Sequence, residues 1–285
     1  MRILIVGASG FIGYRLYKYF NDNSQFEIFG TYNKNKKDNN LIHLNLIIKD
    51  EIERILQEIK PDCIIWIAGN KNVQSCEEHI DETLKINTKP IEVAIEYLNI
   101  KRDYYPHFIY LSTDYVFDGV KGSYTVLDKP NPKTKYGISK YLAEIEIKEK
   151  YKNYTIIRSS AVVGRGGTFY DWIISKLMEE KAIELFEDSF FTPTPIDFLV
   201  KKILYVAAEN KLGTYHICGT KKFSRYTFGI YLKSLSTKFI AEIKPIKLGD
   251  NNKFIQKDLS MIPSEFAKMK DEEFEYYLRK EISND

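Results

Sequence analysis

A tyrosine and a lysine, Tyr136 and Lys140, stand four residues apart in a stretch whose pattern predicts a helix over residues 136–150. Residues four apart lie on one face of a helix, one turn from each other. An ammonium beside a phenol favours the phenolate and lowers the pKa of the tyrosine towards neutral pH. The pair is therefore a candidate general acid or base, and the alternative interpretation is an exposed helical pair.

A second hydroxyl, that of Thr113, follows the apolar run at residues 108–111, which predicts a buried strand. The segment at residues 112–119 reads Ser-Thr-Asp-Tyr-Val-Phe-Asp-Gly. A hydroxyl at a strand end can donate a hydrogen bond to a reacting oxygen, so Thr113 is a candidate second donor beside Tyr136. These residues predict a site for proton transfer.

Three glycines, Gly7, Gly10 and Gly13, lie between an apolar run at residues 1–6 and a helical pattern that starts at Phe11. Glycines let the backbone turn tightly and approach a pyrophosphate, and the helix N-terminus offers it free N–H groups. The arrangement predicts a dinucleotide site, against the alternative that the glycines serve only as turns. The residues assigned to this turn are Gly7, Ser9, Gly10, Phe11, Ile12 and Gly13.

The second predicted strand, at residues 26–32, ends without the acid that would bind a ribose 2′-hydroxyl. A lysine-rich loop follows instead, which suits a 2′-phosphate and favours NADPH, with NADH left as an alternative. The competing interpretation is a merely solvated loop. Further cofactor contacts are expected from residues at strand ends, namely Tyr32, Asn33, Lys34, Asn45, Leu46, Ala68, Gly69 and Asn70.

Strands alternate with helices along the first part of the chain, which predicts an α/β fold with a doubly wound, Rossmann-type parallel sheet. We expect a dinucleotide-binding domain at residues 1–160, with segments returning later, and a smaller substrate lobe mainly at residues 161–285. One long helical stretch, interrupted near Pro90, is expected at residues 73–98. Residues 190–195 are expected to be irregular, and residues 213–218 to form a strand.

The composition and charge of the chain argue against several classes of partner and cofactor. The 285 residues carry a net charge of +3, which is too small to suggest a nucleic-acid or membrane partner. The three cysteines are scattered and odd in number, with no metal-ligand spacing among them, so no metal site is predicted. A reducing, cytoplasmic setting is expected. No apolar run approaches the length of a membrane span.

The chain resembles the extended short-chain dehydrogenase/reductases, and within them most closely the dTDP-4-dehydrorhamnose reductase family. Residues 112–119 resemble the hallmark of that family almost letter for letter, and residues 73–77, 158–164 and 188–194 resemble three further segments. The features shared with the wider superfamily are the glycine turn, Ala68-Gly69, Asn87, Ser112-Thr113, and Tyr136 with Lys140.

The resemblance implies an oxidoreductase of polysaccharide biosynthesis that reduces a keto group on a nucleotide-linked deoxysugar with NADPH. It implies Tyr136 as proton donor, and Lys140 as the residue that lowers the tyrosine pKa and binds the nicotinamide ribose. Thr113 would hydrogen-bond the carbonyl oxygen. Substrate contacts are implied for Val73, Asp114, Tyr115 and Ala161.

The sequence departs from that family at several residues, and alternative functions stay open. Ala161 stands where that family usually has a tryptophan, and Phe190 and Phe191 replace smaller or polar residues, so the sugar is not specified. Tyr115 replaces a glutamate typical of sugar dehydratases, which favours reduction over the alternative of an epimerase or dehydratase. The family also resembles a non-catalytic NADP-binding regulatory subunit of methionine adenosyltransferase. A homodimer is left open.

Overall fold

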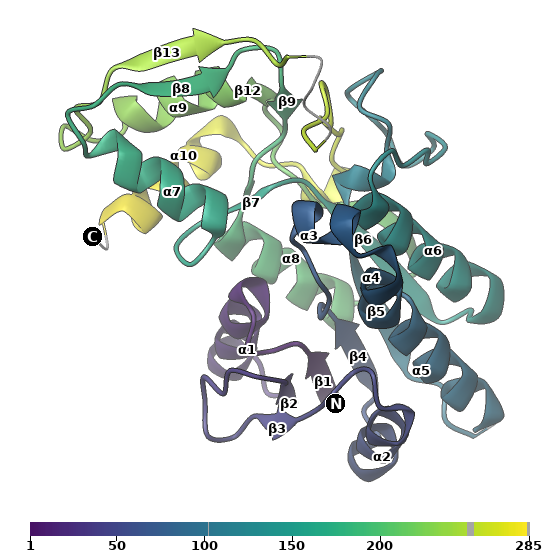
Figure 1. Ribbon diagram of the computed structural model, residues 1–285. Coiled ribbons are helices and arrows are strands. Elements are labelled where there is room, and N and C mark those ends of the chain that lie inside the picture. The colour runs from purple at the N-terminus through teal and green to yellow at the C-terminus, as the bar shows by residue number, and fades with distance from the viewer. Residues whose placement is uncertain (102, 250–253, 284–285) are drawn as a thin grey trace. The chain divides into compact units, whose positions relative to one another are not determined.

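The computed structural model describes residues 1–101, 103–249 and 254–283. The chain forms two compact units (Figure 1). The first unit comprises Met1–Val116, Pro132–Arg158 and Val200–Tyr215, and the second comprises Phe117–Asn131, Ser159–Leu199 and His216–Asp285. The chain therefore passes between the units several times, and residues 117–131 belong with the second.

A seven-stranded sheet in the order β11-β6-β5-β4-β1-β2-β3 forms the centre of the first unit. The pairs β1–β2, β1–β4, β2–β3 and β4–β5 are parallel. This is the Rossmann-like α/β fold that the alternating strands and helices predict. The strands are β1 (Arg2–Val6), β2 (Glu27–Tyr32), β3 (Ile42–His43), β4 (Cys63–Trp66), β5 (His107–Thr113), β6 (Tyr154–Ser159) and β11 (Gly213–His216).

The central strands are buried along their whole length, because a parallel sheet is covered by helices on both faces. All seven residues of β5 are buried, as are all four of β4. Trp66 and Phe108 stack in this core with ring centroids 5.9 Å apart. The helices are α1 (Phe11–Asn23), α2 (Lys49–Ile59), α3 (Val73–Glu78), α4 (Ile80–Asn87), α5 (Lys89–Ile100), η1 (Asp114–Val116) and α6 (Lys135–Lys150).

The expectation of a helical stretch at residues 73–98 that is interrupted near Pro90 holds only in part, because three separate helices occupy it and only one of the two breaks lies near Pro90. The first break is at His79, whose φ of −134° and ψ of 70° are not helical. The second is at Thr88, directly before the helix that carries Pro90 in its first turn. A proline there lacks only an N–H that has no partner within the helix, so Pro90 opens α5 rather than interrupting it.

The second unit contains several short sheets. Its elements are β7 (Val162–Val163), α7 (Thr168–Leu177), β8 (Ile183–Phe186), β9 (Phe190–Phe191), β10 (Thr194–Pro195), β12 (Phe223–Ser224), α9 (Arg225–Ser234), β13 (Ile243–Ile246), η2 (Glu265–Ala267) and α10 (Asp271–Ser283). Helix α8 (Ile196–Ala208) begins in this unit and continues into the first.

The expectation that residues 190–195 are irregular is also wrong. Strand β9 pairs antiparallel with β12, and β10 pairs parallel with β7. These strands are two residues long and are held by pairing with distant segments, which local periodicity does not reveal. None of the helices in the part of the chain that the structure describes is long and apolar enough to cross a membrane.

Candidate active site

The predicted residues of the first unit gather at one edge of its sheet. The glycine turn follows β1, the lysine-rich loop follows β2, Ala68 to Asn70 follow β4, and Thr113 ends β5. Because these strands are parallel, their carboxyl ends lie at the same edge. In doubly wound sheets this is the edge where ligands bind.

The glycine turn is tight and is held from β2. Gly7 has a φ of +95°, and a Cβ there would lie 2.8 Å from the backbone nitrogen of Ala68. A Cβ on Gly13 would lie 2.1 Å from the carbonyl oxygen of Gly7. The buried Thr31, which the sequence analysis did not assign to the site, accepts a hydrogen bond from the Gly7 N–H at 3.0 Å.

The start of α1 is free to meet an anion. Gly10 is its N-cap and supplies no side chain, and the first turn carries no acidic residue. A Cβ on Gly10 would meet nothing closer than 3.4 Å, so this glycine leaves the approach from outside open. N–H groups at the start of a helix bind phosphate oxygens. These features fit the pyrophosphate of a dinucleotide.

Three lysines lie on aromatic rings around this turn. Lys36 lies 5.6 Å from the ring centroid of Tyr32, Lys37 lies 5.5 Å from Tyr14, and Lys71 lies 5.5 Å from Phe11. Burial lowers the pKa of Lys71, and the charge of Lys37 lowers it further. The ammonium groups of Lys37 and Lys71 repel each other beside the uncapped start of α1. A bound group of high negative charge would relieve this repulsion.

Lys71 was missed by the sequence analysis because it follows a different strand, β4, from the lysine-rich loop. Lys34, which was predicted, is exposed. Asn45 has a local contact: its side-chain oxygen accepts from the Ile47 N–H at 3.3 Å. Leu46 packs against the core of the unit. The cofactor roles of these residues stay predictions.

The loop after β4 is tied to α6 by the buried Asn87. Its Oδ1 accepts from the Asn70 N–H at 2.6 Å, and its Nδ2 donates to Ser139 Oγ at 2.9 Å. Ser139 in turn donates to the carbonyl oxygen of Tyr136 at 2.7 Å. Asn87 thus connects the predicted cofactor loop to the helix that carries Tyr136.

Helix α6 lies close against the end of β5 because of a glycine. A Cβ on Gly137 would lie 2.1 Å from the carbonyl oxygen of Tyr115. The side chain of Thr134 caps the helix and accepts from the Gly137 N–H at 3.0 Å. The structure therefore brings Tyr136 to Thr113, whose side chain hydrogen-bonds it, and to Tyr115, whose ring centroid lies 5.7 Å away.

The expectation that Lys140 lowers the pKa of Tyr136 is wrong for this structure. Burial is the main influence and raises the pKa of Tyr136, while the hydrogen bond with Thr113 opposes that rise. The amine of Lys140 donates to the carbonyl oxygen of Leu111 at 2.7 Å and lies 4.1 Å from the ring centroid of Tyr110. Burial lowers the pKa of Lys140 to about 7, against the opposing charge of Glu144.

A fully buried ion pair lies behind these residues and was also missed. Glu144, one turn after Lys140, accepts from Arg158 Nη2 at 2.6 Å and from Arg158 Nε at 3.0 Å. Glu144 also accepts from the Ser112 hydroxyl at 2.6 Å and from Lys148 Nζ at 3.5 Å. Burial raises the pKa of Glu144, but the hydrogen bonds and charge of Arg158 outweigh it, so the net shift is downward.

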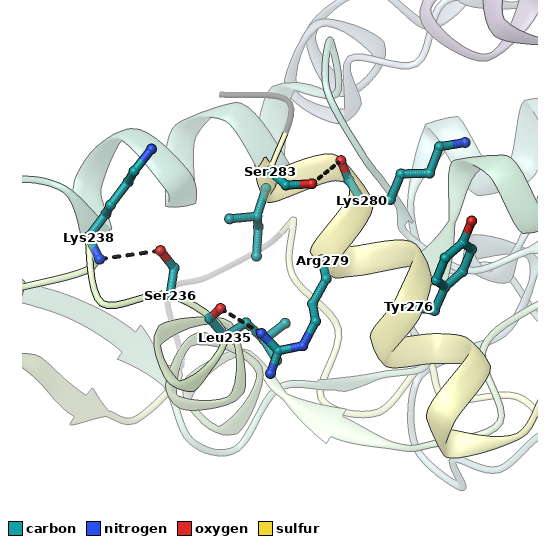
Figure 2. Close-up of a pocket in the computed structure, with 8 residues that line it drawn as sticks. Leu235, Ser236, Lys238, Tyr276, Arg279, Lys280 and Ser283 are labelled. Carbon is teal, nitrogen blue, oxygen red and sulfur yellow. Dashed lines mark hydrogen bonds between the residues drawn. The ribbon is translucent and has the colours of Figure 1, made fainter.

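Ala161, Phe190 and Phe191 lie in the second unit. Also in this unit is a pocket of about 670 Å³, lined by residues of the segment after α9 and of α10 (Figure 2). Two of its lining cations have partners: Arg279 donates to the Leu235 carbonyl oxygen at 3.0 Å and bonds Glu275, and Lys280 bonds Asp197. None of the predicted site residues lines it.

Fold and site together define a Rossmann-like α/β protein with a tyrosine and a lysine at the carboxyl edge of its sheet. The sequence model of the family described as RmlD substrate binding domain matches residues 1–259. The chain belongs to this family, as its resemblance at residues 112–119 predicts.

Three curated relatives of this chain carry different names. The spore coat polysaccharide biosynthesis protein SpsK of Bacillus subtilis is 29% identical, over 80% of this chain and 76% of that protein. The dTDP-4-dehydrorhamnose reductase of Aggregatibacter actinomycetemcomitans is 27% identical, over 80% and 77%. The methionine adenosyltransferase 2 subunit beta of Danio rerio is 28% identical, over 65% of this chain and 53% of that subunit.

Solved structures agree on the fold. The dTDP-4-dehydrorhamnose reductase of Bacillus anthracis, in complex with NADP, superposes with a TM-score of 0.85 over 99% of both chains at 23% identity. At that identity the match supports the Rossmann-like fold of this chain.

Proposed function

We propose that this protein reduces a keto group on a nucleotide-linked deoxysugar with NADPH, in the biosynthesis of a polysaccharide. The observation that carries the proposal is the hydrogen bond between Thr113 and the buried Tyr136, at the sheet edge that also holds the glycine turn. The name of the bacterial reductase among its relatives supports the same activity. The cofactor is assigned to the first unit, and the sugar nucleotide is the substrate.

Tyr136 is the proton donor in this mechanism. Because burial raises the pKa of its phenol, the proton stays on the tyrosine oxygen at neutral pH and is available for a developing alkoxide. The hydroxyl of Thr113 donates a second hydrogen bond to the alkoxide oxygen of the sugar and stabilises its negative charge. NADPH, when bound, supplies the hydride.

Lys140 then acts on the tyrosinate that proton donation leaves behind. With a pKa lowered to about 7, its amine is partly protonated at neutral pH, and its charge offsets the new negative charge. In this structure the amine is bonded to Leu111, so we assign it a supporting role rather than prior activation of Tyr136. Asp114, Tyr115, Val73 and Ala161 are assigned to the sugar.

The cofactor preference follows from the lysines. Replacing both Lys37 and Lys71 by glutamine removes two positive charges from the glycine turn. We expect the double variant to bind NADPH roughly 10-fold to 100-fold more weakly, since hydrogen bonds to charged groups contribute about 1.5–3 kcal/mol each and part of this is lost to solvent. Affinity for NADH should change little.

Isothermal titration with each cofactor measures this change, and Lys18→Gln, at an exposed position of α1 that is not assigned to the cofactor, is the control. Equal loss of NADPH and NADH affinity in the double variant would contradict a 2′-phosphate role for these lysines.

Two rival functions make different predictions in the same assay. A sugar epimerase would convert its substrate without net consumption of NADPH. A non-catalytic regulatory subunit would bind the cofactor and convert no sugar; one relative is named as the beta subunit of methionine adenosyltransferase 2. The intact set of Thr113, Tyr136 and Lys140 favours the reductase.

The test is NADPH consumption with freshly prepared 4-keto-6-deoxy sugars linked to dTDP, UDP, GDP or CDP. We expect oxidation of NADPH with one of them and a reduced sugar nucleotide as product. Interconversion of sugars at constant NADPH would favour an epimerase, and binding of NADPH without any conversion would favour the regulatory function.

A further inference from the structure

Arg225, in the second unit, has no ionic partner among the residues that the structure describes. The guanidinium carbon of Arg225 lies 5.0 Å from the ring centroid of Phe169 and 5.4 Å from that of Phe191. Its Nε is buried and has no hydrogen-bond partner among the described residues. A guanidinium carries five N–H donors, so this side chain retains its capacity for an anion.

The position of Arg225 is fixed by its backbone. It directly follows β12, which pairs with β9 through Phe223 and Phe191. Its N–H donates to the Ser189 carbonyl oxygen at 3.0 Å. The preceding Ser224 forms a capping box with Thr227, so the start of α9 is already capped by protein groups. The guanidinium is therefore held in place without a salt bridge.

Two carboxylates close to this segment bond groups other than Arg225. Lys222 bonds Asp258, and Asp258 also accepts from the Ser260 hydroxyl at 2.6 Å. Asp188 accepts from the Leu248 N–H at 2.8 Å. No carboxylate of the described chain bonds the Arg225 side chain, although most of the described arginines have such a partner.

We propose that Arg225, held between Phe169 and Phe191, binds the diphosphate of a nucleoside diphosphate. Guanidinium groups bind phosphate oxygens through two parallel N–H bonds, and the two rings orient the planar group without using its donors. Trp172 stacks on Phe169 with centroids 6.2 Å apart and is 42% exposed. It offers a nearby aromatic face for the base, because bases stack on aromatic side chains. The choice of the sugar nucleotide as the source of this diphosphate rests on the proposed function.

The test is isothermal titration of the full chain with dTDP, UDP, GDP and CDP, without sugar. We expect at least one of them to bind, and Arg225→Met to weaken that binding roughly 10-fold to 100-fold, as loss of charged hydrogen bonds predicts. Arg225→Lys keeps the positive charge but loses the planar guanidinium. Its affinity for the nucleoside diphosphate should lie between that of the parent and that of Arg225→Met. Arg279→Met, which removes an arginine that has its own carboxylate partner, is the control and should bind as the parent does.

The source of the diphosphate is tested by titrating NADP into the same variants. Unchanged NADP affinity in Arg225→Met assigns Arg225 to the sugar nucleotide, and a loss confined to NADP would overturn that assignment. Equal nucleoside diphosphate affinity in the parent, Arg225→Met and Arg225→Lys, or no binding to the parent, would overturn the site itself. Arginine-dependent binding without turnover of any keto-sugar would contradict the reductase and leave this site intact.

Discussion

Replacement of Tyr136 by phenylalanine is expected to lower kcat by about 10²–10⁴-fold, the range that general acid catalysis contributes. The buried phenol is the hydroxyl that Thr113 hydrogen-bonds, so its loss removes the proton donor and leaves Thr113 without this partner. The affinity for NADPH should fall much less, because the glycine turn and the lysines that surround it are untouched. Steady-state kinetics together with cofactor titration measure the two effects separately.

Tyr141→Phe is the matched control, since Tyr141 lies on the same helix, directly after Lys140, and is half-buried. It loses the same hydroxyl group away from Thr113, so its kcat should stay near that of the parent. Full turnover in Tyr136→Phe would exclude Tyr136 as the proton donor.

Replacement of Glu144 by glutamine is expected to destabilise the protein by about 3–5 kcal/mol, because it leaves Arg158 buried without a counter-charge. Both side chains are essentially inaccessible to solvent, at 0% and 1%. The apparent midpoint of thermal unfolding should fall on the order of 10 °C. Circular dichroism on heating measures this fall.

The control is Glu58→Gln, which breaks an exposed pair with Arg54 on α2 and should change stability by less than about 1 kcal/mol. Because the folded pKa of Glu144 lies below its ordinary value, its contribution to stability is present at neutral pH and is lost as acid protonates the folded carboxylate. An unchanged midpoint in Glu144→Gln would contradict the role assigned to this buried pair.

The same pair also positions the site. Glu144 bonds Ser112, the residue before Thr113, and lies two helical turns after Tyr136 on α6. It therefore joins the strand that carries one hydroxyl to the helix that carries the other. Spacing alone shows Tyr136 and Lys140, but it does not show that the next residue of the same face is paired with an arginine on β6.

The order of strands and helices around the glycine turn could be predicted from the sequence, because residues 3–6 of β1 and all of β4 are continuous apolar runs and α2 has a clear apolar face. Four-residue spacing likewise placed Tyr136 beside Lys140. Four-residue spacing could not predict where the amine of Lys140 points, because that depends on its hydrogen bond to the carbonyl oxygen of Leu111 on β5. Nor does spacing show the burial of the phenol, which raises the pKa of Tyr136 and is the main reason that the expected fall was wrong.

The second unit was less predictable. Its strands are short and pair with segments far away in sequence, as β8 does with β13. Helix α10 was not recognised, although Phe274, Leu278 and Ile282 recur every four residues and are buried. Arg225 carries no sequence signal, since only the rings of Phe169 and Phe191 and the lack of a carboxylate distinguish it from other surface cations.

The most direct test of the central claim is transfer of deuterium to the sugar nucleotide that the protein converts, from NADPH that carries deuterium at both hydrogen positions of the nicotinamide C4 carbon. Mass spectrometry and NMR of the product would locate the label. The account predicts one deuterium on the former carbonyl carbon, with one oxidised cofactor released for each product formed. An unlabelled product, or a converted sugar with no oxidised cofactor, would contradict it.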